Sequence, residues 1–236
     1  MRSSPLNPLE HLAIGGSSVA STVGYLTSSH SPVEITSIRS LTLVGSTSTD
    51  MDAATRVIQL AGPNIEHFCW HSPNPDPYDD NDDFDNTPYW IFPIRLELLP
   101  RLRSLTIIVD SDMTEIISVQ YITSIRSLPQ NSAIEKLTII ITSTDLDDLE
   151  SELQKTVIDV SLSNLGINRL LPRLAAINIW VLCDEPHILH TDVGKSQEVW
   201  HERWFPLTAS AITGLAVHVG IDTLSRLSEL LEDIRD

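Results

Sequence analysis

Cysteine is scarce in this sequence, because Cys69 and Cys183 are the only two among 236 residues. Two thiols cannot build a disulfide framework, and their scarcity favours a reducing compartment. The opening residues contain no apolar run of the kind that a signal peptide requires, and no stretch is apolar over the length of a bilayer. We therefore expect a cytoplasmic or nuclear protein that does not cross a membrane.

Basic residues are also few. Lys and Arg number 15 against 32 Asp and Glu, which gives a formal net charge of −17. Nucleic acids and anionic lipid surfaces are polyanions, so this balance argues against both as partners. Apolar residues make up 42% of the chain and charged residues 20%, a composition typical of a folded domain rather than a disordered one.

Signatures of catalysis are missing as well. The sequence contains no G-x-S-x-G nucleophile elbow, no G-x-G-x-x-G, no Walker loop and no H-E-x-x-H. Gly15 and Gly16 follow a predicted strand, but no lysine stands where a phosphate-binding loop would need it. We therefore predict that the protein is not an enzyme and uses no cofactor.

A repeat is present. Its pattern is an apolar residue, two variable residues, an apolar residue, one variable residue and another apolar residue. Seven copies begin at Leu9, Ile38, Ile65, Leu102, Ile134, Leu174 and Ile212. Each copy ends in period-two alternation, which predicts a short strand, and helix-period segments lie between the copies. Strand and helix repeated in this way imply parallel strands joined by crossovers, and a solenoid is the most economical arrangement.

The hexamer TSIRSL occurs twice, and its context predicts two shapes. At residues 36–41 it enters a strand, because the alternation continues beyond it. At residues 123–128 it closes a helix before Pro129, because apolar residues recur every three positions up to Leu128. Helices are also predicted before Gly62-Pro63, over residues 145–160, and over residues 221–236 as a C-terminal cap on the end of the stack.

Phrases such as LAGPNIEHFCW and LLPRLAAINIW, set in long irregular units, resemble fungal F-box/leucine-rich-repeat proteins. The resemblance implies one α/β domain over residues 1–236, a leucine-rich-repeat-like solenoid of about seven irregular strand-helix units with a curved parallel sheet and outer helices. It also implies a non-catalytic protein-interaction module, the substrate-recognition part of an F-box-type ubiquitin-ligase adaptor. Only the repeat region is covered, since no F-box precedes the repeat at Leu9 and the family's Asn or Cys after each strand is replaced.

Two other interpretations remain open. One is a small-molecule enzyme on an open, doubly wound parallel sheet, with its site at the carboxyl edge of the strands. The other is a truncated repeat protein that has no stable partner. Solution scattering separates the enzyme from the repeat protein, because a compact globule favours the first and an elongated arc favours the second.

Three alternating residues give one candidate metal site. A strand would project His67, Cys69 and His71 to the same face, which makes a partial zinc set without an identifiable fourth ligand. We expect no metal to be bound there. A second metal-like group, His187, His190 and Asp192, is interpreted as surface residues in a loop. Trp200 and Trp204, four positions apart, are interpreted as a packed pair in the core.

The Pro- and Asp-rich segment of residues 73–88 imitates part of a calcium-binding loop. However, Phe84 stands where that loop needs glycine, and Trp90 stands where it needs its last glutamate. We therefore predict a solvated loop insertion rather than a metal site.

The partner-binding surface is predicted on the concave sheet between the fourth and sixth repeats. Residues between the core-facing positions of each strand face the hollow and form two columns. The first column is Ala13, Thr42, Cys69, Thr106, Thr138, Asn178 and Ala216, and the second is Gly15, Val44, His71, Ile108, Ile140, Trp180 and His218. Exposed apolar patches that contain Trp normally mark interaction sites. The predicted binding residues are therefore Thr106, Ile108, Thr138, Ile140, Asn178 and Trp180.

An alternative for these residues is that the connecting segments or the terminal helix fold over them and make them core. The substitution Trp180→Ala separates the two. An anchor would lose roughly 2 kcal/mol of partner affinity with little loss of stability. A core residue would lower the melting temperature first, because truncating a buried aromatic costs about 3–5 kcal/mol.

Overall fold

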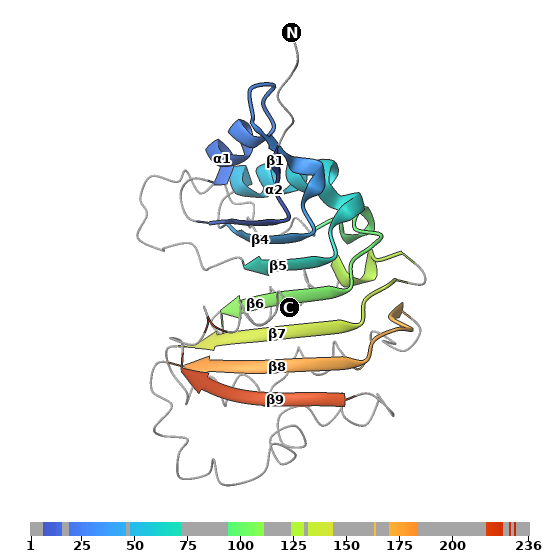
Figure 1. Cartoon of the computed structure of the whole chain (residues 1–236). Coiled ribbons are helices and arrows are strands. Elements are labelled where there is room, and N and C mark those ends of the chain that lie inside the picture. The colour runs from blue at the N-terminus through green and yellow to red at the C-terminus, as the bar shows by residue number, and fades with distance from the viewer. Residues whose placement is uncertain are drawn as a thin grey trace.

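The computed structural model describes residues 7–15, 19–45, 48–71, 94–110, 124–129, 132–143, 163, 170–183, 216–223, 227 and 229. Seven of its strands form one parallel sheet in which the strand order follows the chain order (Figure 1). These strands are β2 (His11–Ile14), β4 (Ser40–Val44), β5 (His67–His71), β6 (Ser104–Asp110), β7 (Lys136–Ser143), β8 (Ala176–Cys183) and β9 (Ala216–Thr223). One strand coincides with each copy of the repeat, so the predicted α/β class with a parallel sheet is confirmed.

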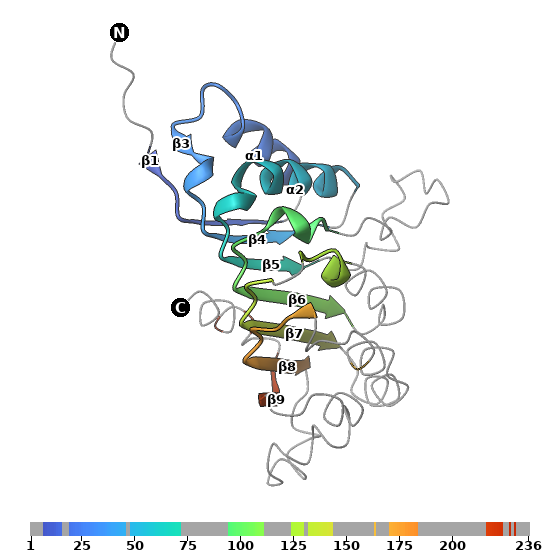
Figure 2. The ribbon, with the colours of Figure 1, turned by 90° about the vertical axis from the view of Figure 1, so that its right-hand side faces the viewer.

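Two α-helices lie against one face of this sheet, beside its first strands (Figure 2). They are α1 (Val19–Leu26) and α2 (Ser48–Ala61). Helix α2 carries Asp50 in its first turn and gives way to the 3-10 turn η3 (Gly62–Asn64), which confirms the predicted stop at Gly62-Pro63. The remaining elements are the 3-10 turns η2 (Ile35–Ser37) and η5 (Leu96–Leu98), and the small pair β1 (Asn7–Pro8) and β3 (Val33–Glu34).

The repeated hexamer adopts the two shapes that its contexts predict. Residues 36–41 run from η2 into β4, whereas residues 124–126 are helical and the turn ends at Pro129. The apolar pair is buried in both copies, Ile38 with Leu41 and Ile125 with Leu128. Two apolar residues three positions apart are therefore buried in both copies. In the first copy they lie just before and within strand β4, and in the second they lie in and just after one helical turn.

The main core lies between the sheet and the helices, and we call it the helix-side core. Every strand contributes a residue at the same register position, so the apolar side chains form continuous rows across the sheet. One such row is Leu12, Leu41, Phe68, Leu105, Leu137 and Ile177, of which all but Leu12 are buried. Each apolar side chain in a row is buried by its neighbours on the adjacent strands, so the recurring apolar positions of the repeat are the residues that form the core.

The corner before each strand is bonded in the same way from unit to unit. The carbonyl of Glu10 accepts from the amides of Arg39 and Ser40 at 2.8 and 3.0 Å, and that of Arg39 accepts from Glu66 and His67 at 2.7 and 3.0 Å. The carbonyls of Glu66, Arg103 and Glu135 repeat this pattern. This recurrence fixes the stagger between successive units.

The side chains at these corners alternate in charge along the sheet. The series is Glu10, Arg39, Glu66, Arg103 and Glu135, and Arg39 Nη1 lies 3.6 Å from Glu66 Oε1. Exposed ion pairs of this kind contribute little stability, typically about 0–1 kcal/mol. The alternation of charge bears on strand order instead, because pairing a strand with the wrong neighbour can place two corners of like charge side by side.

The seventh strand corrects two expectations. The motif at Ile212 predicts Ala216 beside Asn178 and His218 beside Trp180, but the structure pairs Asn178 with His218 and Trp180 with Gly220. The sequence alternates over both frames, so a shift of two residues keeps the same side chains on each face. The predicted C-terminal helix also begins too early, because residues 221–223 belong to β9; residues 227 and 229 are helical.

The substitution Gly62→Ala is expected to lower the free energy of unfolding by roughly 1–3 kcal/mol, because it overpacks a tight contact. A Cβ atom at Gly62 would lie 2.6 Å from the Leu98 carbonyl oxygen, which belongs to the backbone of η5 and cannot swing aside. Urea unfolding measures the effect. Gly24→Ala in α1 is the control, since its Cβ would meet nothing within 4 Å. Equal losses in the two variants would refute the close approach.

Several sequence interpretations lie outside the described residues. They concern the insertion at residues 73–88, the helix at residues 145–160, the group His187, His190 and Asp192, and the pair Trp200 and Trp204. Among the helices of the described ranges, none combines the length and the apolar character that crossing a membrane would need.

Candidate functional site

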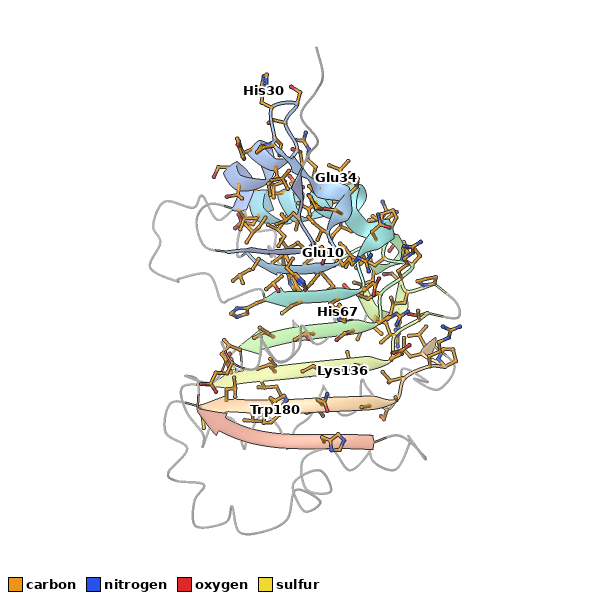
Figure 3. All side chains as sticks on the ribbon, in the orientation of Figure 1. Glu10, His30, Glu34, His67, Lys136 and Trp180 are labelled. Atoms are coloured by element: carbon orange, nitrogen blue, oxygen red, sulfur yellow. The ribbon has the colours of Figure 1, made fainter. Side chains whose placement is uncertain are left out.

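The sheet face opposite α1 and α2 is the candidate site, and we call it the front face. Strand register brings all six predicted binding residues together on three adjacent strands. Thr106, Thr138 and Asn178 are paired neighbours in one row, and Ile108, Ile140 and Trp180 are paired neighbours in the next. Figure 3 shows Trp180 on β8 and Lys136 on β7. The predicted columns are therefore correct for the first six strands.

The expected exposure of this surface is wrong at its centre. Ile108 and Ile140 are 1% and 0% exposed, and with Cys69 and Leu182 they form a second buried cluster, which we call the front cluster. Trp180 and Leu227 are partly buried and pack against it. The alternative interpretation, in which these residues are core, therefore holds for Ile108 and Ile140.

A signal for this burial was present in the sequence. Strands β2 and β4 alternate apolar and polar residues, but β7 has three consecutive isoleucines, Ile139 to Ile141, and β8 ends in a similar apolar run. Runs of this kind are typical of parallel strands that are buried on both faces. The front face is exposed at His11, Ala13 and Gly15, at and just after β2; it is buried at Ile108 on β6 and Ile140 on β7, half-buried at Asn178 and Trp180 on β8, and exposed again at His218 on β9.

Three buried hydroxyl groups on the front face have no hydrogen-bond partner in the structure. They belong to Ser104, Thr106 and Thr138, whose exposed fractions are 5%, 0% and 1%, and we call them the hydroxyl cluster. Thr106 and Thr138 are directly paired across β6 and β7. Leaving a buried hydroxyl without a partner costs about 1–3 kcal/mol. The hydroxyl cluster on β6 and β7 is therefore able to donate and accept hydrogen bonds that the folded chain does not supply.

His67 extends this polar region onto β5. It is the register neighbour of Ser104, and its Nδ1 atom is buried without a hydrogen-bond partner. Burial lowers its pKa from the usual 6.5; Glu66 opposes this shift, while His11, Arg103 and Lys136 add to it. The neutral imidazole offers one donor and one acceptor nitrogen.

The lowered pKa of His67 predicts a pH dependence of stability. The unfolded chain binds a proton near 6.5 more readily than the folded one, so stability should fall as the pH drops below 6.5, and His67 should contribute no pH dependence well above it. The variant His67→Gln is expected to flatten this slope, measured as urea midpoints at about pH 7.5 and about pH 5.5. His30→Gln, at an exposed turn, serves as the control. An unchanged slope in His67→Gln would contradict the assignment.

The charge of the front face differs from that of the whole chain. Along the first three register rows of this face from β2 to β9, the described positions contain no Asp or Glu, although the chain carries a net charge of −17. The basic side chains there are His11, His67, His71, Lys136 and His218. The fourth row of the same register contains Asp110 on β6 and Asp222 on β9, so the absence of carboxylates holds only for the first three rows.

The candidate metal ligands lie on strand β5. His67, Cys69 and His71 do share the front face of β5, as their alternation predicts. Across the part of the chain that the structure describes, however, no three metal-ligating side chains gather closely enough to hold an ion.

Comparisons with known proteins give no relative. The chain matches no protein-family model, no curated protein and no solved structure.

Proposed function

We propose that the chain is a leucine-rich-repeat-like solenoid that binds a protein on its front face and catalyses no reaction. The strand order supports this architecture. A doubly wound enzyme sheet reverses its strand order at a switch point where the ligand binds, whereas here each new strand is added to the same edge, from β2 through to β9. The recurring corner hydrogen bonds and the placement of α1 and α2 on one face are in keeping with stacked units.

The observation that carries the binding role is the hydroxyl cluster. Buried polar groups in folded proteins are nearly always hydrogen-bonded, so three adjacent exceptions need an external explanation. Because these residues are buried, an incoming polypeptide would reach them only when the front face opens locally; its amides and carbonyls would then bind the hydroxyl groups in either sense. The neighbouring Lys136 and neutral His67 add further donors and an acceptor on the same face.

The resemblance to F-box/leucine-rich-repeat proteins supplies the cellular role within this proposal. The front face would hold the target protein of a ubiquitin-ligase adaptor. The contacts with the ligase would come from a different module.

Site-specific cross-linking tests the binding role. A photoreactive residue replaces His218, which is exposed in the same row as Thr138, or Tyr25, which is 57% exposed on α1. After irradiation in a cell extract, the His218 position should yield a discrete cross-linked protein and the Tyr25 position should not. Equal products from both positions, or none from either, would overturn the proposal.

A further inference from the structure

We propose that Ser31 is a phosphorylation site for a proline-directed serine/threonine kinase, and that the phosphate releases strand β1 from strand β3. The site lies in the turn between α1 and β3. The inference is independent of the proposed binding role of the front face.

The turn between α1 and β3 presents Ser31 at the surface. Ser29, His30 and Pro32 beside it are exposed, and His30 lies at the outer end of this turn (Figure 3). A following proline restricts a residue to an extended backbone, the form in which protein kinases bind their substrates. Among the described ranges, Ser31 is the only Ser or Thr that precedes a proline.

Pro32 also indicates the class of kinase. Because proline has no backbone N–H, it suits a substrate groove that offers no acceptor at the position after the modified serine. Any other residue at that position would leave its amide without a partner when it binds there. A proline-directed kinase is therefore the class whose groove matches this turn.

The Ser31 hydroxyl is only weakly engaged within the fold. Its Oγ atom accepts from the Val33 amide at 3.2 Å and lies 3.4 Å from the Val33 carbonyl oxygen, whereas hydroxyl donors usually sit about 2.7–2.8 Å from an oxygen acceptor. Phosphorylation breaks the bond between the γ-phosphorus and the bridging oxygen of ATP and forms a bond from that phosphorus to Oγ. The hydroxyl proton passes to the base of the kinase, and ADP leaves.

A phosphate on Ser31 would meet negative charge along its own segment. It carries a charge of about −1.5 to −2 at pH 7. Glu34 follows three residues later in β3, and its carboxylate accepts from Thr36 Oγ1 at 3.1 Å. No Lys or Arg occurs between Val19 and Ile38. Repulsion between the phosphate and Glu34 therefore destabilises β3.

Strand β3 in turn holds β1. The two strands pair over two residues each, with Pro8 opposite Glu34. Pro8 has no amide to donate, and a two-stranded pair is marginal by itself. Ser37 supports the pair, because its Oγ accepts from the Leu9 amide at 2.7 Å and lies 2.6 Å from the Glu34 carbonyl oxygen. A destabilised β3 therefore releases β1.

The modification is tested by incubating the full-length chain with ATP and a purified proline-directed serine/threonine kinase. Mass spectrometry should find phosphate at Ser31, and Pro32→Ala should slow its transfer to Ser31 roughly tenfold or more. Ser29→Ala is the matched control, an exposed serine of the same turn without a following proline, and should leave the rate unchanged. No phosphate at Ser31, or equal rates in wild type and Pro32→Ala, would overturn the assignment.

Hydrogen exchange of the phosphorylated full-length chain tests the release of β1. The Leu9 amide should exchange roughly tenfold faster than in the unmodified chain, while the Thr106 amide in β6 keeps its rate. Unchanged exchange at Leu9 would show that β1 stays paired. Equal acceleration at Leu9 and Thr106 would show general unfolding. Either result overturns the release of β1.

Discussion

Replacing Phe68 with alanine is expected to lower the free energy of unfolding by about 3–5 kcal/mol. Phe68 is 2% exposed and lies in the helix-side row between Leu41 and Leu105. Removing the ring leaves a cavity between two neighbouring strands that the corner hydrogen bonds hold at fixed stagger, so the site cannot collapse to fill it. Urea unfolding followed by circular dichroism measures the loss.

The matched control for Phe68→Ala is Leu60→Ala. Leu60 is 43% exposed on α2, so its truncation should change the free energy of unfolding by less than about 0.5 kcal/mol. Comparable losses in the two variants would mean that the helix side of the sheet is not a packed core.

The pair of substitutions Thr106→Val and Thr138→Val is expected to raise the free energy of unfolding, by roughly 1 kcal/mol for each hydroxyl removed. Both hydroxyls are buried without partners, and valine keeps the shape while removing the unmet hydrogen bond. Valine also suits a strand at least as well as threonine. Most substitutions of buried residues destabilise, so a gain of this size is a specific expectation.

Thr42→Val provides the comparison for this pair. Thr42 lies in the same row on β4 but is only half-buried, so its hydroxyl can reach water and its removal should have little effect. A loss of stability in the Thr106→Val/Thr138→Val variant would show that the two hydroxyls make bonds within the folded chain.

The positions of the strands could be predicted because the signal is local. Each copy of the motif places its last two apolar residues two apart, and β-branched residues favour the extended chain, as in the LTI of residues 105–107. The frame of the seventh strand could not be predicted. Both candidate frames alternate correctly, and only pairing with β8 selects the one that sets His218 beside Asn178.

For the candidate site, the sequence predicted the sheet face on which the residues lie but not their burial. Alternation correctly placed Thr106, Ile108 and their neighbours on one face, because side-chain direction follows from the strand period. Their burial is a matter of tertiary packing: the cluster that contains Ile108 also includes Leu182 and is packed against by Leu227, both far along the chain from β6. An amphipathic stripe such as that of the C-terminal segment shows that a helix needs an apolar partner surface, but not which surface it meets.

The sequence could not predict that the hydroxyls of the hydroxyl cluster lack hydrogen-bond partners, and the reason is again tertiary. Threonine on a strand is ordinary, and nothing in the letters around Thr106 or Thr138 distinguishes a bonded hydroxyl from an unbonded one. The distinction arises only when β5, β6 and β7 are assembled and every neighbouring donor and acceptor is accounted for.

The yield of the His218 cross-link in the Thr106→Val/Thr138→Val variant tests most directly whether the front face keeps its hydroxyls for a protein partner. Valine has the shape of threonine, so only the hydrogen-bonding capacity of the face changes in this variant. We predict a protein that is more stable than wild type and whose cross-linked product falls at least tenfold at equal concentration, as expected for about 1.4 kcal/mol or more of lost affinity. A stabilised variant that cross-links as well as wild type would contradict it.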